Sequence, residues 1–188
     1  MASKQCEADK VEPVIGGFMG EHLALLKKGY SFSGYERDKV WINKGDGTFY
    51  DISGISGADS ISDGRAAVFG DFDNDGDLDI FLRAMHGQAT FLFRNEIGQE
   101  KNSLRVVLTG TRSGKDAFGA VVRVKTPAGI LTKVKHGGGR YLAQSDPRLL
   151  FGLGDAEKVD WIEVTWPNGA KQRVEGGSAG STIRITEK

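Results

Sequence analysis

The sequence predicts an all-β protein with one short helix near its N-terminus. Two observations lead to this fold class. Glycine occurs 27 times and proline only 4 times, which favours many tight turns between short strands. From Tyr30 onward, most apolar segments are short and alternate apolar with polar residues, as half-buried strands do. The chain of 188 residues is long enough to bury a core as one ordinary domain or two small ones.

The composition excludes several classes of partner. Lys and Arg total 25 and Asp and Glu total 25, so no global field attracts nucleic acid or an anionic membrane. No run reaches the roughly 18 apolar residues of a membrane span. Cys6 is the only cysteine, so no intrachain disulfide can form. The first residues lack the apolar stretch of a signal peptide, so the protein is either cytosolic or has lost a leader.

The first half of the chain reads as a helix followed by short strands. Residues 1–13 are expected to be disordered, and GFMGEHLALLKKG (17–29) has the spacing of a helix that stops at Gly29. The glycine-containing turn KGDG joins VWIN and TFYDIS as a hairpin. AAVFG (66–70) and LDIFL (78–82) flank an acidic stretch, and ATFLFRN (89–95) follows. WINKG recurs as FRNEIG, a single period of a blade-like repeat.

The second half reads as a separate sheet structure. After the polar linker GQEKNS, six segments alternate, with PAG, GGGR and PNG as turns. In VDWIEVTW, for example, Ile162, Val164 and Trp166 share one face. We expect a small antiparallel sandwich or barrel over residues 99–188. The alternating segments are LRVVLTG, AVVRVKT, ILTKVKH, VDWIEVTW, KQRVE and STIRITE.

The acidic stretch DFDNDGDLD (71–79) is the strongest candidate site. Its aspartates fall at positions 1, 3, 5 and 9 of a loop with Gly76 at position 6, and calcium takes six to eight oxygen ligands. The loop contains no Cys or His, which argues against zinc. Leu82 stands at position 12, where an EF-hand needs Glu. The predicted Ca²⁺ ligands are Asp71, Asp73, Asp75, Asp77 (through its carbonyl) and Asp79; the alternative is a solvated acidic turn.

These motifs resemble two known families. GDFDNDGDLDIF looks like the calcium loop of FG-GAP/VCBS blades, and NKGDGTFYDIS resembles the strand pair that precedes such a blade. TRSGKDAFGAVVRV, YLAQSDPRLLFGLG and VDWIEVTWPNG resemble the ASPIC/UnbV domain of the cartilage acidic protein-like family. The resemblance covers roughly residues 29–186.

The resemblance implies a domain plan and a general role. Residues 14–98 would form the helix and a partial, propeller-like FG-GAP blade, packed on or linked to an ASPIC/UnbV sandwich over 99–188. Members of these families are taken as Ca²⁺-stabilised recognition modules, so the resemblance implies an extracellular or periplasmic location and a protein or carbohydrate ligand. This chain has one calcium loop and one repeat period, which fits a half-propeller or a protomer that needs partners.

Two further polar sets are candidate recognition residues. Ion pairing and turn formation are the simpler interpretations of both sets, since Asp146–Pro147 is typical of a turn. The first set lies in SGYERD and SDGRA, and the second lies in the loops after residue 135. The candidates are Glu36, Arg37, Asp63 and Arg65 in the first set, and His136, Arg140, Tyr141 and Arg148 in the second.

The sequence favours a Ca²⁺-binding recognition or assembly module over an enzyme. GxSxG, Walker A and HExxH motifs are absent, and no residue is assigned a catalytic role. One alternative is a biosynthetic accessory enzyme of unknown reaction with a loop site near His136. Another is a self-associating unit, a possible homo-oligomer, that pairs through exposed sheet edges.

Overall fold

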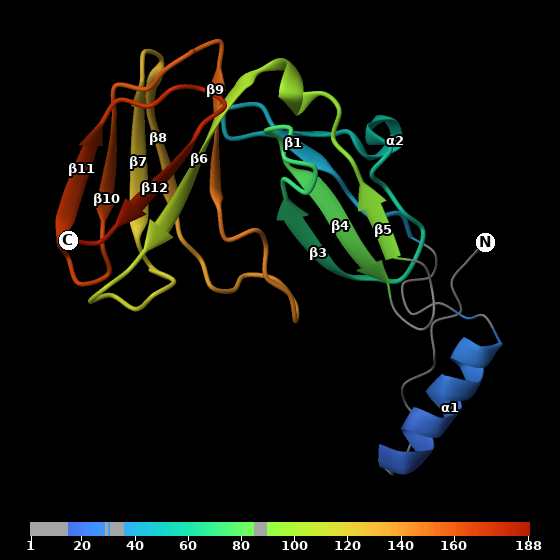
Figure 1. Ribbon diagram of the computed structural model, residues 1–188. Helices are drawn as coiled ribbons and strands as arrows, with labels where there is room; N and C mark the ends of the chain where they lie inside the picture. The colour runs from blue at the N-terminus through green and yellow to red at the C-terminus, as the bar shows by residue number, and fades with distance from the viewer. Residues whose placement is uncertain (1–14, 29, 31–35, 85–89) are drawn as a thin grey trace. The chain divides into compact units, whose positions relative to one another are not determined.

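The computed structural model describes residues 15–28, 30, 36–84 and 90–188, and it confirms an all-β chain (Figure 1). Strands outnumber helices throughout, and they assemble into separate sheets rather than a closed barrel. The elements are α1 (Ile15–Lys27), β1 (Trp41–Asn43), β2 (Phe49–Asp51), α2 (Ser53–Ser56), β3 (Gly64–Gly70), β4 (Asp79–Ala84), β5 (Thr90–Phe93), the 3-10 turn η2 (Gly98–Glu100), β6 (Asn102–Thr109), β7 (Val121–Thr126), β8 (Gly129–Val134), β9 (Leu149–Gly154), β10 (Trp161–Thr165), β11 (Lys171–Glu175) and β12 (Thr182–Thr186).

The chain divides into two compact units. One comprises the residues up to Arg65 together with Arg83–Thr90, and the other comprises Ala66–Leu82 and Phe91–Lys188. The acidic stretch therefore falls in the same unit as the C-terminal strands. The domain boundary expected between residues 98 and 99 rests on the polar linker GQEKNS, and it stays a prediction.

The first unit contains α1 and the β1–β2 hairpin. α1 covers most of the predicted helix, and the predicted disorder of residues 1–13 lies outside the described residues. The hairpin pairs Trp41 with Asp51 in an antiparallel register. The four-residue helix α2 was not predicted. It begins where Asp51 accepts hydrogen bonds from the Ser53 N–H (3.0 Å) and hydroxyl (2.5 Å). No described helix is long and apolar enough to cross a bilayer.

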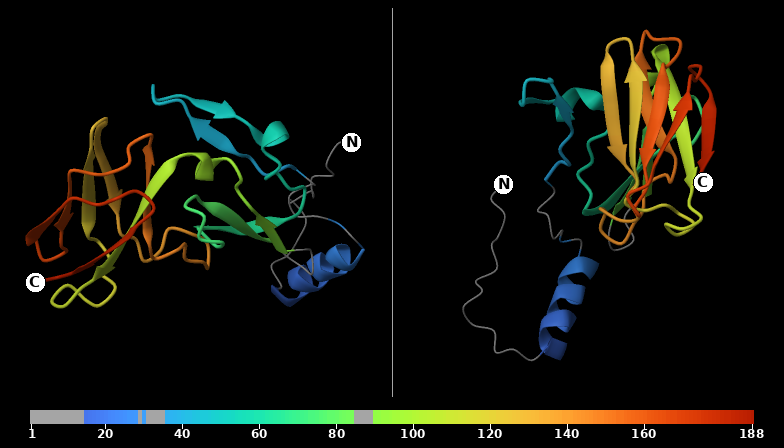
Figure 2. Two further views of the ribbon diagram at one scale, coloured as in Figure 1. Left: turned by 45° about the horizontal axis from the view of Figure 1, so that its top comes forward. Right: turned by 90° about the vertical axis from the view of Figure 1, so that its left-hand side faces the viewer.

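The second unit is built around a sandwich of two sheets (Figure 2). One sheet has the antiparallel order β11-β10-β7-β8, and the other has the order β12-β6-β9. Alternation decides which side chains are buried. Ile162, Val164 and Trp166 are at most 2% exposed, so the predicted buried face of this strand is confirmed. They pack with Leu104 and Val106 of the opposite sheet in one hydrophobic core.

Two details of the sandwich differ from the expectation. β12 runs parallel to β6, because the chain leaves β11 in one sheet and crosses to the other before β12 begins. β9 is not one of the six alternating segments, since Gly152 and Gly154 interrupt its apolar pattern. A third sheet, of order β3-β4-β5, carries the acidic loop in the connection between β3 and β4.

A buried carboxylate fastens the C-terminal strand to the loop that follows β6. Glu187 Oε2 accepts hydrogen bonds from three consecutive backbone N–H groups, those of Thr111 (2.8 Å), Arg112 (2.8 Å) and Ser113 (2.9 Å). Its Oε1 accepts from the Ser113 hydroxyl (2.7 Å) and from Asn168 Nδ2 (2.7 Å). Burial acts to raise the pKa of Glu187, but these hydrogen bonds outweigh it and lower the pKa from 4.5 to about 2.

This carboxylate predicts an acid-labile sandwich. A pKa lower in the folded state contributes stability above pH 4.5, and that stability is lost as the pH falls from 4.5 towards 2. We expect Glu187→Gln to lower the thermal midpoint at neutral pH and to flatten its pH dependence in this window. Thermal unfolding at a series of pH values measures both effects. The exposed Glu157→Gln is the control, and parallel pH curves for wild type and Glu187→Gln would contradict the prediction.

Candidate metal centre

The acidic loop curls so that alternate side chains turn to one side. Asp73 Oδ1 accepts the N–H of Asp75 (3.2 Å), and Asp75 Oδ1 accepts the N–H of Asp77 (3.2 Å). Asn74 (φ 64°) and Gly76 (φ 104°) adopt the left-handed conformation that these tight turns require. The positive φ angle at Gly76 agrees with its expected role at position 6 of the loop.

Three carboxylates converge within this loop. Asp71, Asp73 and Asp75 each offer an oxygen, and these oxygens lie within 4.8 Å of one another. Asp71 is only 2% exposed, yet its Oδ1 has no hydrogen-bond partner. Asp75 Oδ2 is also buried without a hydrogen bond. An unpaired buried carboxylate oxygen is costly, and oxygens of this kind are the ligands that Ca²⁺ prefers. The residues present therefore fit a calcium ion.

The remaining two aspartates lie outside this group of three. Asp77 Oδ2 accepts the N–H of Gln99 (3.0 Å), and burial raises the pKa of Asp77. Asp79 accepts the N–H groups of Phe72 (3.0 Å) and Asn95 (2.8 Å) through its two carboxylate oxygens. Both side chains thus fix the loop to neighbouring backbone. The predicted ligation by the Asp77 carbonyl and by Asp79 stays a prediction.

A buried arginine from the core sheet neutralises the first aspartate. Arg105 of β6 donates through Nε to Asp71 Oδ2 (2.6 Å), and its Nη2 also contacts that oxygen. The same Nη2 donates to the carbonyl of Asn74 (2.9 Å). The Arg105 and Asp71 side chains are 10% and 2% exposed, so this is a buried ion pair. It positions the loop against a strand that the hydrophobic core holds rigidly.

A second arginine holds the backbone of the loop. Arg148, just before β9, donates to the Asp71 carbonyl (2.6 Å) and to Asn74 Oδ1 (2.6 Å). Its Nε donates to both carboxylate oxygens of Asp146 (2.8 and 3.0 Å). Burial acts to raise the pKa of Asp146, but the hydrogen bonds and charge of Arg148 outweigh it and lower the pKa. Arg148, a candidate recognition residue, thus has structural contacts.

A third arginine pairs with the loop from the surface. Arg94 lies 2.6 Å through Nε from Asp73 Oδ2, and its Nη2 lies 3.7 Å from Asp75 Oδ2. The Arg94 side chain is 55% exposed, so this pairing is weaker than the buried one. Arg94 thus stands beside two of the three clustered carboxylates.

The other candidate recognition residues lie in different places. Arg37 pairs with Asp59 (2.5 Å), Glu36 is exposed, Asp63 is buried, and Arg65 donates to the carbonyl of the preceding residue (3.0 Å). All four candidates belong to the first unit. Their role in recognition stays a prediction.

The loop between β8 and β9 carries the remaining three candidates. His136 and Arg140 line one cavity, and Tyr141 is 65% exposed. The sequence did not single out Arg105, the residue that pairs with Asp71 in the acidic loop. Its signal was a charged side chain within the apolar run of β6, between Leu104 and Val106.

Two segments of the chain match known protein families. Residues 110–188 match the ASPIC and UnbV family, and residues 30–82 match an FG-GAP-like repeat. The C-terminal part of the chain is thus similar to ASPIC/UnbV domains, and the segment before it is similar to an FG-GAP-like repeat. The acidic loop lies in the FG-GAP-like segment, whereas the buried Glu187 lies in the ASPIC/UnbV domain.

Three relatives share the name Cartilage acidic protein 1. The chain is 39% identical to the human protein over 129 residues, which cover 65% of this chain and 19% of the relative. The mouse protein is 40% identical over 111 residues (56% and 17%), and the Xenopus tropicalis protein is 36% identical over 133 residues (68% and 18%). The chain therefore spans less than a fifth of the length of these curated relatives.

The buried Asp71–Arg105 pair predicts that removing Arg105 lowers the free energy of unfolding more than removing Arg94 does. Arg105→Ala leaves Asp71 as an uncompensated buried charge, and we expect a loss of about 3–5 kcal/mol in the free energy of unfolding. Arg94→Ala removes an exposed partner and should cost about 1 kcal/mol or less. Urea unfolding followed by tryptophan fluorescence, in chelator, gives both values. Equal losses in the free energy of unfolding for the two variants would contradict the prediction that Arg105 stabilises the loop more than Arg94 does.

Proposed function

We propose that the acidic loop binds one Ca²⁺ ion and that the chain is a calcium-stabilised recognition or assembly module of extracellular type. The observation that carries this proposal is the convergence of Asp71, Asp73 and Asp75 within 4.8 Å, with a buried carboxylate oxygen of Asp71 unpaired. Without a cation these carboxylates repel one another, so bound calcium would supply the positive charge that stabilises the curled loop.

The donor set favours calcium over other divalent ions. All three clustered ligands are carboxylates, whereas zinc prefers sites that include Cys or His. Magnesium demands near-ideal octahedral geometry and keeps several waters, while calcium accepts irregular oxygen cages. A loop that presents side chains from alternate positions suits the more tolerant ion.

The family assignment supports a role in recognition outside the cell. An FG-GAP-like repeat and relatives named for cartilage both favour an extracellular or periplasmic location. The partner would be a protein or a carbohydrate. The ion would rigidify the loop and its connections to β6 and β9, which reduces the ordering cost of binding a partner.

Calcium is expected to raise the thermal midpoint of the protein. A site filled a hundredfold over its dissociation constant adds about 2.7 kcal/mol. For a chain of this size, that corresponds to a shift of roughly 5–10 °C. Thermal unfolding with Ca²⁺, with Mg²⁺ and with chelator measures the shift, and Asp75→Ala should abolish it.

The matched control changes the same charge outside the loop. Asp155 is 89% exposed and pairs with Lys101 at the surface (2.8 Å), so Asp155→Ala should keep the full calcium shift. Loss of the shift in both variants would point to a non-specific charge effect. Absence of a shift in the wild type would refute the calcium site and favour a solvated acidic turn.

Arg94 is expected to compete with the ion. Its guanidinium lies beside Asp73 and Asp75, so a cation in the cluster must displace or outweigh that positive charge. We therefore expect Arg94→Gln to lower the calcium dissociation constant several-fold, measured by isothermal titration calorimetry. Arg173→Gln on β11, which alters a surface arginine paired with Glu175, is the control. An unchanged constant in Arg94→Gln would place the ion away from these two carboxylates.

A further inference from the structure

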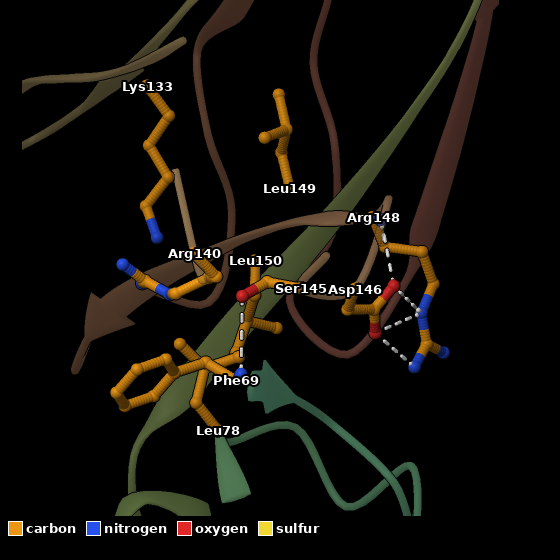
Figure 3. A pocket seen from close by; sticks show the side chains of 9 residues that line it. All are labelled: Phe69, Leu78, Lys133, Arg140, Ser145, Asp146, Arg148, Leu149 and Leu150. Atoms are coloured by element: carbon orange, nitrogen blue, oxygen red, sulfur yellow. Dashed lines mark hydrogen bonds and ion pairs between the residues drawn. The ribbon is translucent and has the colours of Figure 1, made fainter. Parts of the chain in front are cut away.

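The second unit contains a cavity of about 310 Å³ near the end of β8 and the start of β9 (Figure 3). It is lined by side chains from β3, β8, β9, the loop between the last two, and the acidic loop, which contributes Leu78. A second cavity, of about 330 Å³, shares Arg140, Ser145, Asp146 and Leu149 with it. The volume is that of a small-molecule site.

Two cations in this cavity have no counter-ion among the residues that the structure describes. Asp146 and Arg148 also line it, but they are paired with each other at 2.6 Å. Neither Lys133 nor Arg140 forms an ion pair with any carboxylate in the described part of the chain. The cavity therefore carries an uncompensated positive charge.

Aromatic rings hold these two cations in place. The Arg140 guanidinium lies 4.9 Å from the centroid of the Phe69 ring, and Lys133 Nζ lies 5.7 Å from that of Phe151. Figure 3 shows the Lys133 side chain extending towards Arg140. Burial lowers the pKa of Lys133, as expected for an ammonium group that lacks a partner. An anion between the two groups would offset both the burial and their repulsion.

The rest of the wall is largely apolar. Phe69, Leu78, Leu149 and Leu150 line the cavity, and Ser145 contributes a hydroxyl that accepts the Phe69 N–H (3.3 Å). An apolar wall favours a ligand with an apolar body. The carboxylate of Asp146 in the same wall disfavours a compact dianion such as sulfate or phosphate.

We propose that this cavity binds a small organic carboxylate, with the carboxylate between Lys133 and Arg140 and the apolar body against Phe69 and Leu149. The planar guanidinium of Arg140 can donate two parallel hydrogen bonds to a carboxylate, and Lys133 supplies a second charge-assisted donor. This ligand class follows from the two unpaired cations and the apolar wall, and it does not depend on the calcium site.

The test is a titration followed by two-dimensional amide NMR, with benzoate as the probe and benzamide as its neutral counterpart. We expect benzoate to shift the amides of Lys133, Arg140, Ser145 and Leu149 with a dissociation constant on the order of millimolar, as is usual for a fragment of this size. Benzamide should bind at least about tenfold more weakly, because it lacks the charge that the two cations recognise. Equal binding of the two probes would overturn the proposal.

Variants of Arg140 and Lys133 test whether benzoate binds at these two side chains. Neither Arg140 nor Lys133 belongs to the hydrophobic core, so Arg140→Gln and Lys133→Gln should fold, and unchanged amide spectra away from the cavity verify this. Each variant should weaken benzoate binding about tenfold or more, since each removes a charged hydrogen-bond donor. Lys171→Gln on β11, which removes a lysine outside the cavity, should leave binding unchanged. An unchanged dissociation constant in both cavity variants would refute the site.

The titrations are run in metal-free buffer and again with calcium. If benzoate binds in neither buffer, the proposed carboxylate site is wrong. The calcium proposal would remain intact, because the thermal midpoint tests it separately. If benzoate binds in at least one buffer, and that binding is weakened by Arg140→Gln and Lys133→Gln, the site is supported.

Discussion

The position of the acidic loop depends on the buried ion pair between Asp71 and Arg105. Removing two charges from water is expensive, so such a pair persists only where geometry and further hydrogen bonds repay the cost. Arg105 meets this condition through Asp71 and the Asn74 carbonyl. It also stands on β6, between core residues that are fully buried. The acidic loop is thus positioned by the hydrophobic core of the sandwich.

This anchoring explains why a loop of the FG-GAP-like repeat belongs to the compact unit that contains the ASPIC/UnbV domain. Arg105 holds its first carboxylate from one strand, and Arg148 holds its backbone from the approach to another. Neither guanidinium donates to Asp71 Oδ1, which has no hydrogen-bond partner. The arginines therefore reduce the repulsion in the loop and leave this carboxylate oxygen available to a cation. A bound ion would add stability to a loop that is already shaped.

The sequence predicted those features of the fold and of the acidic loop that depend on residues close together in the chain. The alternation around Ile162 and the aspartate spacing around Gly76 each depend on neighbouring residues, and both can be read directly from the sequence. The arginine contacts could not be read this way, since Arg105 and Arg148 lie 34 and 77 positions from Asp71. The parallel pairing of β12 is equally non-local. The position of Arg105 between Leu104 and Val106 indicates a buried charge, but it does not indicate that Asp71 is the partner.

The acidic loop and the cationic cavity share one side chain, that of Arg148. Arg148 donates to the Asp71 carbonyl and, with the same guanidinium, to Asp146 in the cavity wall. An ion that moves the Asp71 carbonyl must therefore either stretch a charge-assisted hydrogen bond or shift the wall. In the second case a cation and an anion would bind with linked free energies, and each would change the affinity for the other by the same factor. The stiffness of the Arg148–Asp146 pair, more than the distance between the sites, would set the size of that factor.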